Sequence, residues 1–340
     1  MSSQGQTQAN ASKPQIDGPP YLVTTAATLG GRPTPSVDDP ICGVFIAFFL
    51  ASAIFNMTIY QRNLRRGHKF LFSAVLCGFS IARIVACSLR IVVGSKPHQV
   101  NTVIASQVFN SAGVVMIFVI NLFFAQRILR AYHPRVGWGK PARLVARFLI
   151  FSLIATLVMT ITAVVYSFYT LDVGVRNTIR HIQLFSVTYI AVLAFLPLPI
   201  TIVSVLSSSP DKVEPFGRGK METKVYLLIA TSTLLAFGAG FRAGTSYVIR
   251  PATDPAWFHH KACFYIVNFV IEIIVVYTYA LSLFDRRFFI PNGSSGPGDY
   301  SRIEEVPIPL GDQSADFTLG SQDELSIRDR QLQKVRNVEE

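Results

Sequence analysis

One acidic residue, Glu272, lies near the middle of an apolar stretch, Ala262–Phe284, that is long enough to cross a bilayer. About 20 apolar residues span a hydrocarbon core of roughly 30 Å. A carboxylate at that depth costs a few kcal/mol even on the scales that assign the smallest penalty. Glu272 therefore needs a compensating group, which is a cationic partner, a proton or a water-filled cavity.

Two arginines inside other apolar stretches are candidate partners of Glu272. Depth along a membrane helix follows from its rise of about 1.5 Å per residue. Counted in this way, the level of Arg83 agrees with that of Glu272 to within roughly 1.5 Å, and the level of Arg242 to within roughly 5 Å. We expect an intramembrane ion pair of Glu272 with one of them, and Arg83 is the better match. Such a pair either locks two helices together or lines a polar cavity.

Three amide side chains favour the cavity. Asn110 and Asn268 lie near the level of Arg242, and Gln107 lies one turn further toward the same surface. Together with the charged residues they predict a polar pocket that opens outward between the third, sixth and seventh apolar stretches. The other interpretation, a purely structural ion pair, stays open at this point.

The fifth stretch contains two prolines, and the sixth contains glycines on either side of its arginine. Gly240 and Gly244 flank Arg242 at the spacing of closely packed membrane helices, and we favour close packing over room left for a ligand. Pro197 and Pro199 remove backbone donors and are expected to bend the fifth stretch.

The composition is that of a membrane protein with many spans. Half of the residues are hydrophobic, only 15% are charged, and the mean hydropathy is +0.40, whereas soluble domains average about a quarter charged. The fold class expected is all-α, a seven-transmembrane helix bundle. Its apolar stretches are Ile41–Tyr60, Phe70–Val93, Val103–Ala125, Phe148–Thr170, Ile182–Leu206, Val225–Ile249 and Ala262–Phe284.

The basic residues set the expected orientation. Most Lys and Arg lie between the first and second, third and fourth, and fifth and sixth stretches, and just after the seventh. The positive-inside rule then places the N-terminus outside and the C-terminus in the cytosol. Asn10 would be a glycosylation site, and Asn292, in the second sequon, would stay unmodified. The net charge of +11 reflects this topology, so no nucleic-acid partner is expected.

Polar segments flank the membrane region. We expect a disordered outer or lumenal tail over residues 1–40, the membrane domain over 41–290, and a disordered cytosolic tail over 291–340. Cys42 and Cys263 both fall at the outer ends of their helices, so a disulfide and two separate thiols remain open alternatives.

Chemistry inside the membrane is restricted by what the sequence lacks. No Asp or Glu occurs between Pro40 and Leu171, and Glu272 has no intramembrane His, Asp or Glu cluster around it. Zinc hydrolases need several such ligands, and serine-type sites need a base beside the nucleophile. We therefore expect no enzyme activity, no catalytic residues, no metal and no cofactor.

The segment Asp254–Ser294 reads DPAWFHHKACFYIVNFVIEIIVVYTYALSLFDRRFFIPNGS. It resembles a family of fungal seven-helix membrane proteins without an assigned function, some of which are labelled G-protein-coupled-receptor-like. More remotely, the layout is similar to that of fungal lipid-translocating exporter-like proteins. The Arg of helix 6 and the acid of helix 7 in those proteins would correspond to Arg242 and Glu272, although the acid lies deeper here.

Three functions follow as hypotheses. The first is a receptor-like sensor with an outward-facing polar cavity, although Ala125-Gln126-Arg127 replaces the Asp-Arg-Tyr motif of rhodopsin-like receptors. The second is a transporter or translocator of lipids or amphiphilic compounds, and the third is a structural membrane scaffold. The expected partners are membrane lipids, a small-molecule or lipid ligand and a cytosolic signalling partner, in the plasma membrane or an endomembrane.

Overall fold

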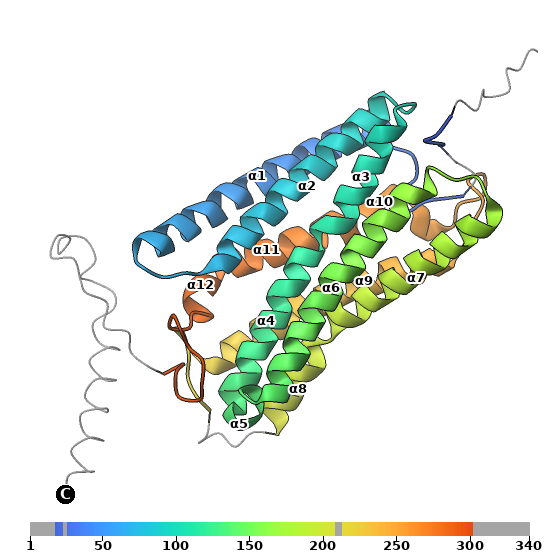
Figure 1. The fold of residues 1–340 in the computed structure, drawn as a ribbon. Coiled ribbons are helices and arrows are strands. Elements are labelled where there is room, and N and C mark those ends of the chain that lie inside the picture. Colours follow the sequence, from blue (N-terminus) through green and yellow to red (C-terminus); the bar gives the residue numbers. More distant parts are fainter. Residues whose placement is uncertain (1–17, 23–25, 208–212, 302–340) are drawn as a thin grey trace, which may run out of the picture. The chain divides into compact units, whose positions relative to one another are not determined.

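The structure is a computed structural model that describes residues 18–22, 26–207 and 213–301. Within these residues it confirms the all-α prediction, with seven helices long and apolar enough to cross a membrane (Figure 1). Helices are the expected outcome, because each backbone N–H and C=O in the hydrocarbon must find a partner within its own segment.

The spanning helices are α1 (Pro35–Arg65), α2 (Leu71–Ser95), α3 (Val100–Gly113) with α4 (Val115–Tyr132), α6 (Lys140–Ser167), α7 (Val173–Phe195) with α8 (Pro197–Leu206), α9 (Met221–Tyr247), and α10 (Lys261–Tyr265) with η3 (Ile266–Val270) and α11 (Ile271–Leu281). The last three form the seventh helix. Short helical turns lie between or after them: α5 (Pro134–Gly137), η2 (Trp257–His259) and α12 (Phe284–Arg287).

Three of the spanning helices are interrupted. The fifth is broken at Leu196, directly before Pro197, where the missing backbone donor of proline predicts an irregularity. The third is broken at Val114, after Gly113. In the seventh, residues Ile266–Val270 form a π-helical turn. The prolines of the fifth helix predict the first of these interruptions, and the other two were not predicted.

The first helix begins at Pro35, six residues before the predicted start. A proline in the first turn and an acid, Asp38, near the positive end of the helix dipole both favour a start here. The preceding chain is anchored too, because Ala27 N–H donates to the Arg250 carbonyl (2.8 Å) and Gly30 N–H to the His259 carbonyl (3.0 Å). We call this end of the bundle the amino-terminal end. Part of the predicted N-terminal tail is therefore packed.

The opposite end, which we call the basic end, contains the loops rich in Lys and Arg and the segment after α11. Phe288 stacks on Phe124 with ring centroids 4.1 Å apart. Tyr300 is buried against Trp138 (5.3 Å between centroids), and the Asn292 amide donates to the Gly67 carbonyl (3.1 Å). Residues 291–301 of the predicted cytosolic tail are thus anchored to the bundle through the buried Pro291 and Tyr300, while most of the residues between them are exposed.

The seventh helix is the centre of the packing. In its most apolar stretch 61% of residues are buried, against 22% in α6. Val275, Val276 and Tyr279 are fully buried. In contrast, α1 and α2 pack side by side along their length at one side of the bundle (Figure 1). Charged side chains on the seventh helix are therefore held inside protein rather than lipid.

Candidate functional site

The structure brings Glu272 and Arg83 together in the middle of the bundle. Arg83 Nε donates to Glu272 Oε2 (2.5 Å) and Arg83 Nη2 donates to Glu272 Oε1. Both side chains are almost fully buried, at 0% and 1% exposure. A two-bond arginine–carboxylate pair has the geometry best able to offset the desolvation of both charges. The carboxylate points into the bundle rather than toward lipid.

The remaining surface of Arg83 is also occupied. Its Nη1 donates to the backbone carbonyl of Asn110 (3.0 Å) and approaches the Asn110 Oδ1 (3.4 Å). The guanidinium lies 5.5 Å from the ring centroids of Phe79 and of Phe269. Arg83 is therefore held from α2, α3 and the seventh helix at once, with its donors used within the protein.

Gly113 lets α3 approach this guanidinium. A Cβ built at Gly113 would lie 3.1 Å from Arg83 Cζ, which is tighter than ordinary van der Waals contact. Because the guanidinium is fixed by two bonds to Glu272, it has little freedom to move away. The glycine and the helix break that follows it thus accommodate the buried arginine.

Arg242 on α9 lies on the other side of the carboxylate. Its Nη1 is 3.8 Å from Glu272 Oε1 and donates to Asn268 Oδ1 at 3.1 Å. The Asn268 amide in turn donates to the Phe264 carbonyl (3.0 Å). Its side chain keeps 18% exposure, so Arg242 is the accessible member of the charge cluster. Two guanidiniums thus share one carboxylate, and the site carries an excess positive charge.

The π-helical turn places these groups. It contains Asn268 and ends at Val270, so Glu272 follows it in the first turn of α11. A π-helical turn widens the backbone and is frequent at functional sites. It rotates the carboxylate relative to the residues before it, and both Asn268 and Glu272 face Arg242.

Both predicted partners of Glu272 and two of the three predicted cavity-lining amides therefore belong to one network, which we call the central charge network: Arg83, Arg242, Asn110 and Asn268, together with Glu272 itself. Gln107 does not join it, because its side chain is exposed and only its backbone carbonyl has a described partner, Ser111. Depth placed Gln107 near the others, but the rotation of α3 turns it away. The predicted outward cavity itself stays a prediction, and Asn10 lies outside the described residues.

A second buried charge cluster at the amino-terminal end was not predicted. Asp38 is fully buried and accepts from Arg90 Nε (2.8 Å), Tyr265 Oη (2.6 Å) and Lys261 Nζ. Arg90 also donates to the Gly30 carbonyl at 3.0 Å. The sequence did contain a signal, because Asp38 is an acidic residue in the first turn of a helix. That helix was predicted to start only after Asp38, so Asp38 was interpreted as a solvated residue.

A third polar cluster lies nearer the basic end. Tyr279 donates to Asn121 Oδ1 and shares a hydrogen bond with Thr231 (2.8 Å). The Asn121 amide donates to Ser232 Oγ (2.9 Å). These groups join α4, α9 and α11 without any charge, so they fix how the three helices pack.

The glycines of α9 differ from the expectation. A Cβ at Gly240 or Gly244 would meet no atom within 4 Å, so these residues do not pack closely against another helix of this chain. Gly238 is the one that faces the seventh helix, where a Cβ would lie 3.5 Å from the Val267 carbonyl oxygen. The open face of α9 that Gly240 and Gly244 share lies opposite Arg242, because residues two positions apart on a helix point in nearly opposite directions.

The cysteines do not form the disulfide that the sequence left open. Cys42 and Cys263 are both free: Cys42 Sγ lies 3.4 Å from Tyr265 Oη, and Cys263 Sγ lies 3.9 Å from the Trp257 carbonyl. Within the described residues no group of three or more His, Cys, Asp or Glu is arranged to hold a metal ion.

One family model matches the chain. Residues 214–289 match a family described as "Protein of unknown function (DUF3112)". This stretch holds α9 and the seventh helix, including Arg242, Asn268 and Glu272. Searches of curated proteins and of solved structures give no match. The chain is thus a multi-pass membrane protein similar over this stretch to a family of unknown function, so its role has to be argued from the site.

Proposed function

We propose that this protein is a receptor-like membrane sensor whose ligand carries an anionic group and binds at Arg242. The proposal rests on the different ways in which the Glu272 carboxylate interacts with two guanidiniums. Arg83 makes two hydrogen bonds to Glu272, whereas Arg242 is 3.8 Å away, outside hydrogen-bond distance, and keeps exposed surface.

Arg242 has donors to spare. A guanidinium carries five N–H groups in a planar fork, and the only described hydrogen bond of the Arg242 side chain goes to Asn268. Carboxylate, phosphate and sulfonate groups match this fork through paired hydrogen bonds. The excess positive charge of the central charge network favours such a group over a neutral or cationic one.

The accessibility of α3 supports a path to this site. Only one of its 14 residues, Gly113, is buried. Asn110, which contacts Arg83, is itself half-buried. A ligand approaching from the amino-terminal end, the outer end in the predicted orientation, would meet the loosely covered part of the bundle first.

Binding at Arg242 would alter helix packing. An anion there competes with Glu272 and Asn268 for the guanidinium, and both of these lie at the π-helical turn of the seventh helix. A ligand shifts an equilibrium only through different affinities for two states. In this proposal the states differ in whether Arg242 binds Glu272 and Asn268 or the ligand, and α9 carries the change toward the basic end, where a cytosolic partner would respond.

A second candidate function is transport or translocation of lipids or other amphiphiles. It is favoured by the open face of α9 at Gly240 and Gly244, along which an apolar chain could lie. A third, a structural scaffold, would need the central charge network only for stability.

The test is a thermal-shift screen of purified full-length protein in lipid nanodiscs, with a panel of small carboxylates and anionic amphiphiles. A ligand at 100 times its Kd stabilises the folded state by about 2.7 kcal/mol. Arg242→Gln should remove the shift. Arg250→Gln is the matched control, since Arg250 is 51% exposed and pairs with Asp254 on a loop. Glu272→Gln should strengthen binding, because it removes the competing carboxylate.

Equal shifts in the Arg242→Gln and Arg250→Gln proteins would reject the binding site. Flux of a bound amphiphile across proteoliposomes, lost in Arg242→Gln, would select the transport alternative over the sensor. A network that only stabilises would show lower melting temperatures in the variants and no ligand shift in the unaltered protein.

A further inference from the structure

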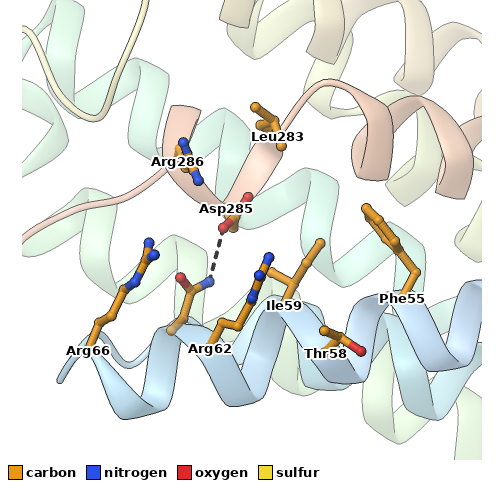
Figure 2. Close-up of a pocket in the computed structure, with 9 residues that line it drawn as sticks. Phe55, Thr58, Ile59, Arg62, Arg66, Leu283, Asp285 and Arg286 are labelled. Atoms are coloured by element: carbon orange, nitrogen blue, oxygen red, sulfur yellow. Dashed lines mark hydrogen bonds between the residues drawn. The ribbon is translucent and has the colours of Figure 1, made fainter. Parts of the chain in front are cut away.

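A cavity of about 260 Å³ lies at the basic end, between the last turns of α1 and the segment after α11. Figure 2 shows Arg62 on α1 and Arg66, directly after α1, across from Leu283, Asp285 and Arg286. The cavity is small for a complete ligand, since typical ligand pockets measure roughly 300–1,000 Å³. Its size suits a small polar group, such as the head of a larger molecule.

Three guanidiniums line this cavity. Arg62, Arg66 and Arg286 are all exposed, and none of their side chains forms a hydrogen bond or ion pair with another described residue. Three unpaired arginines around one small space repel each other. An anion with several oxygens, such as a phosphate, would relieve that repulsion and bind through charge-assisted hydrogen bonds.

A single carboxylate faces them. Asp285 is 8% exposed, and its Oδ2 accepts from the Asn63 amide (3.1 Å). Its Oδ1 is buried and has no hydrogen-bond partner within the described part of the chain. The left-handed backbone of Leu283 (φ 51°) turns the chain so that Asp285 faces α1. A buried carboxylate oxygen without a donor is costly, so the cavity also favours a ligand with an N–H donor.

The cavity adjoins apolar surface. Phe55 and Leu283 line it and remain 44% and 46% exposed, and Leu281 nearby is 78% exposed. Further along, Tyr277 Oη donates to the Phe48 carbonyl (2.9 Å), which holds α11 against α1. The arginines therefore lie where a lipid-facing surface ends, at the level expected for headgroups.

We propose that this cavity binds the headgroup of an aminophospholipid, with phosphatidylserine preferred. Its phosphate and carboxylate would bind Arg62, Arg66 and Arg286, its primary ammonium would donate to Asp285 Oδ1, and its acyl chains would lie along Phe55 and the exposed face of α1. Three arginines and one aspartate leave the cavity with excess positive charge, which the net negative serine headgroup offsets. This site is separate from Arg242 and does not depend on the proposed function.

Lipid chemistry gives the first test. Full-length protein would be titrated with phosphatidylserine, phosphatidic acid and phosphatidylcholine of equal chain length, with bound lipid counted by native mass spectrometry. Phosphatidylserine should bind roughly tenfold or more tightly than phosphatidylcholine, whose quaternary ammonium has no N–H for Asp285. Equal binding of the two lipids would overturn the proposal.

Variants give the second test. The double variant Arg62→Gln/Arg66→Gln should weaken phosphatidylserine binding by roughly tenfold or more. Arg65→Gln is its control, because Arg65 is exposed on the same turns of α1 and does not line the cavity. Asp285→Asn should remove the preference for phosphatidylserine over phosphatidic acid. If Arg65→Gln weakens binding as much as the double variant does, the effect comes from general surface charge, and the proposed site is rejected.

A soluble headgroup distinguishes a phospholipid from a soluble ligand that carries the same phosphate, carboxylate and ammonium groups. Glycerophosphoserine, which has no acyl chains, should compete only weakly because it lacks the contacts with Phe55 and α1. Competition as strong as that of the whole lipid would reject the lipid assignment and leave a soluble phosphoserine-like ligand.

Discussion

Glu272 interacts with its two arginines in different ways, and the variants should reveal the difference. Removing one partner of a buried pair typically costs about 3–5 kcal/mol, because the other charge stays buried. Arg83→Gln should therefore destabilise the protein by about that amount. Arg242→Gln should cost clearly less, because Arg242 lies 3.8 Å from the carboxylate and is 18% exposed. Thermal unfolding of the purified proteins in one detergent measures both.

Arg65→Gln serves as the control for this comparison, since Arg65 is exposed on α1. Its melting temperature should match that of the unaltered protein. A larger loss from Arg242→Gln than from Arg83→Gln would show that the assignment of the strong and the weak partner is reversed.

Asp38 gives a second prediction at this scale. Tyr265→Phe removes one hydroxyl hydrogen bond to Asp38 and should cost about 1 kcal/mol. Asp38→Asn should cost more, about 3 kcal/mol, because Arg90 and Lys261 lose their counter-charge. Tyr277→Phe, which affects a more exposed hydrogen bond, should be close to neutral. Equal unfolding temperatures for the Asp38 and Tyr277 variants would contradict a stabilising role of the amino-terminal cluster.

These residues also show what the sequence could and could not predict. The meeting of Glu272 and Arg83 follows from helix rise, which fixes depth from residue number alone. Gln107 passed the same depth criterion but its side chain is exposed, because depth does not fix the rotation of a helix about its axis. Asp38 was missed because its partners Arg90, Lys261 and Tyr265 lie on other helices, far away in the sequence.

At the scale of single helices, substitutions of glycine by alanine test whether a glycine lies against a neighbouring side chain or faces open space. Gly113→Ala places a Cβ 3.1 Å from Arg83 Cζ, so the fixed guanidinium must shift. Added volume in a tight site costs about 1–3 kcal/mol, more than the gain of up to about 1 kcal/mol from replacing glycine in a helix. We expect a net loss of stability, measured by thermal unfolding.

Gly240→Ala is the matched substitution for Gly113→Ala. Its Cβ would meet no atom within 4 Å, so only the helix propensity changes and stability should stay equal or rise. A loss in Gly240→Ala as large as that in Gly113→Ala would mean that the open side of α9 is covered in the membrane, for example by another copy of the chain.

The breaks in the helices were only partly predictable for a physical reason. Proline predicts an interruption because it has no backbone N–H to donate, and the fifth helix is broken just before Pro197. The π-helical turn at Ile266–Val270 has no such residue. Its cause lies in packing, because the extra residue in the turn lets both Asn268 and Glu272 face Arg242. Periodicity within one helix cannot show this.

For the whole molecule, the number of spanning helices followed from the sequence, and their mutual packing did not. Length and apolarity determine a span, which explains why all seven stretches were found. The ends were extended beyond prediction: α1 starts at Pro35, and Tyr300 is buried at the basic end. In both places a polar composition suggested disorder, but a few residues, such as Tyr300, anchor the segment to the bundle.

Membrane orientation is the remaining property of the whole molecule, and the two sequons test it. The basic end carries Arg62, Arg66 and Arg286 in the structure, and the positive-inside rule retains such an end in the cytosol. Endoglycosidase treatment of protein expressed in a eukaryotic cell should therefore produce a mobility shift that Asn10→Gln abolishes and Asn292→Gln leaves intact. The reverse pattern would place the basic end outside. It would also move the lipid cavity to the outer leaflet, where phosphatidylserine is scarce, so the orientation decides whether that cavity meets its proposed lipid.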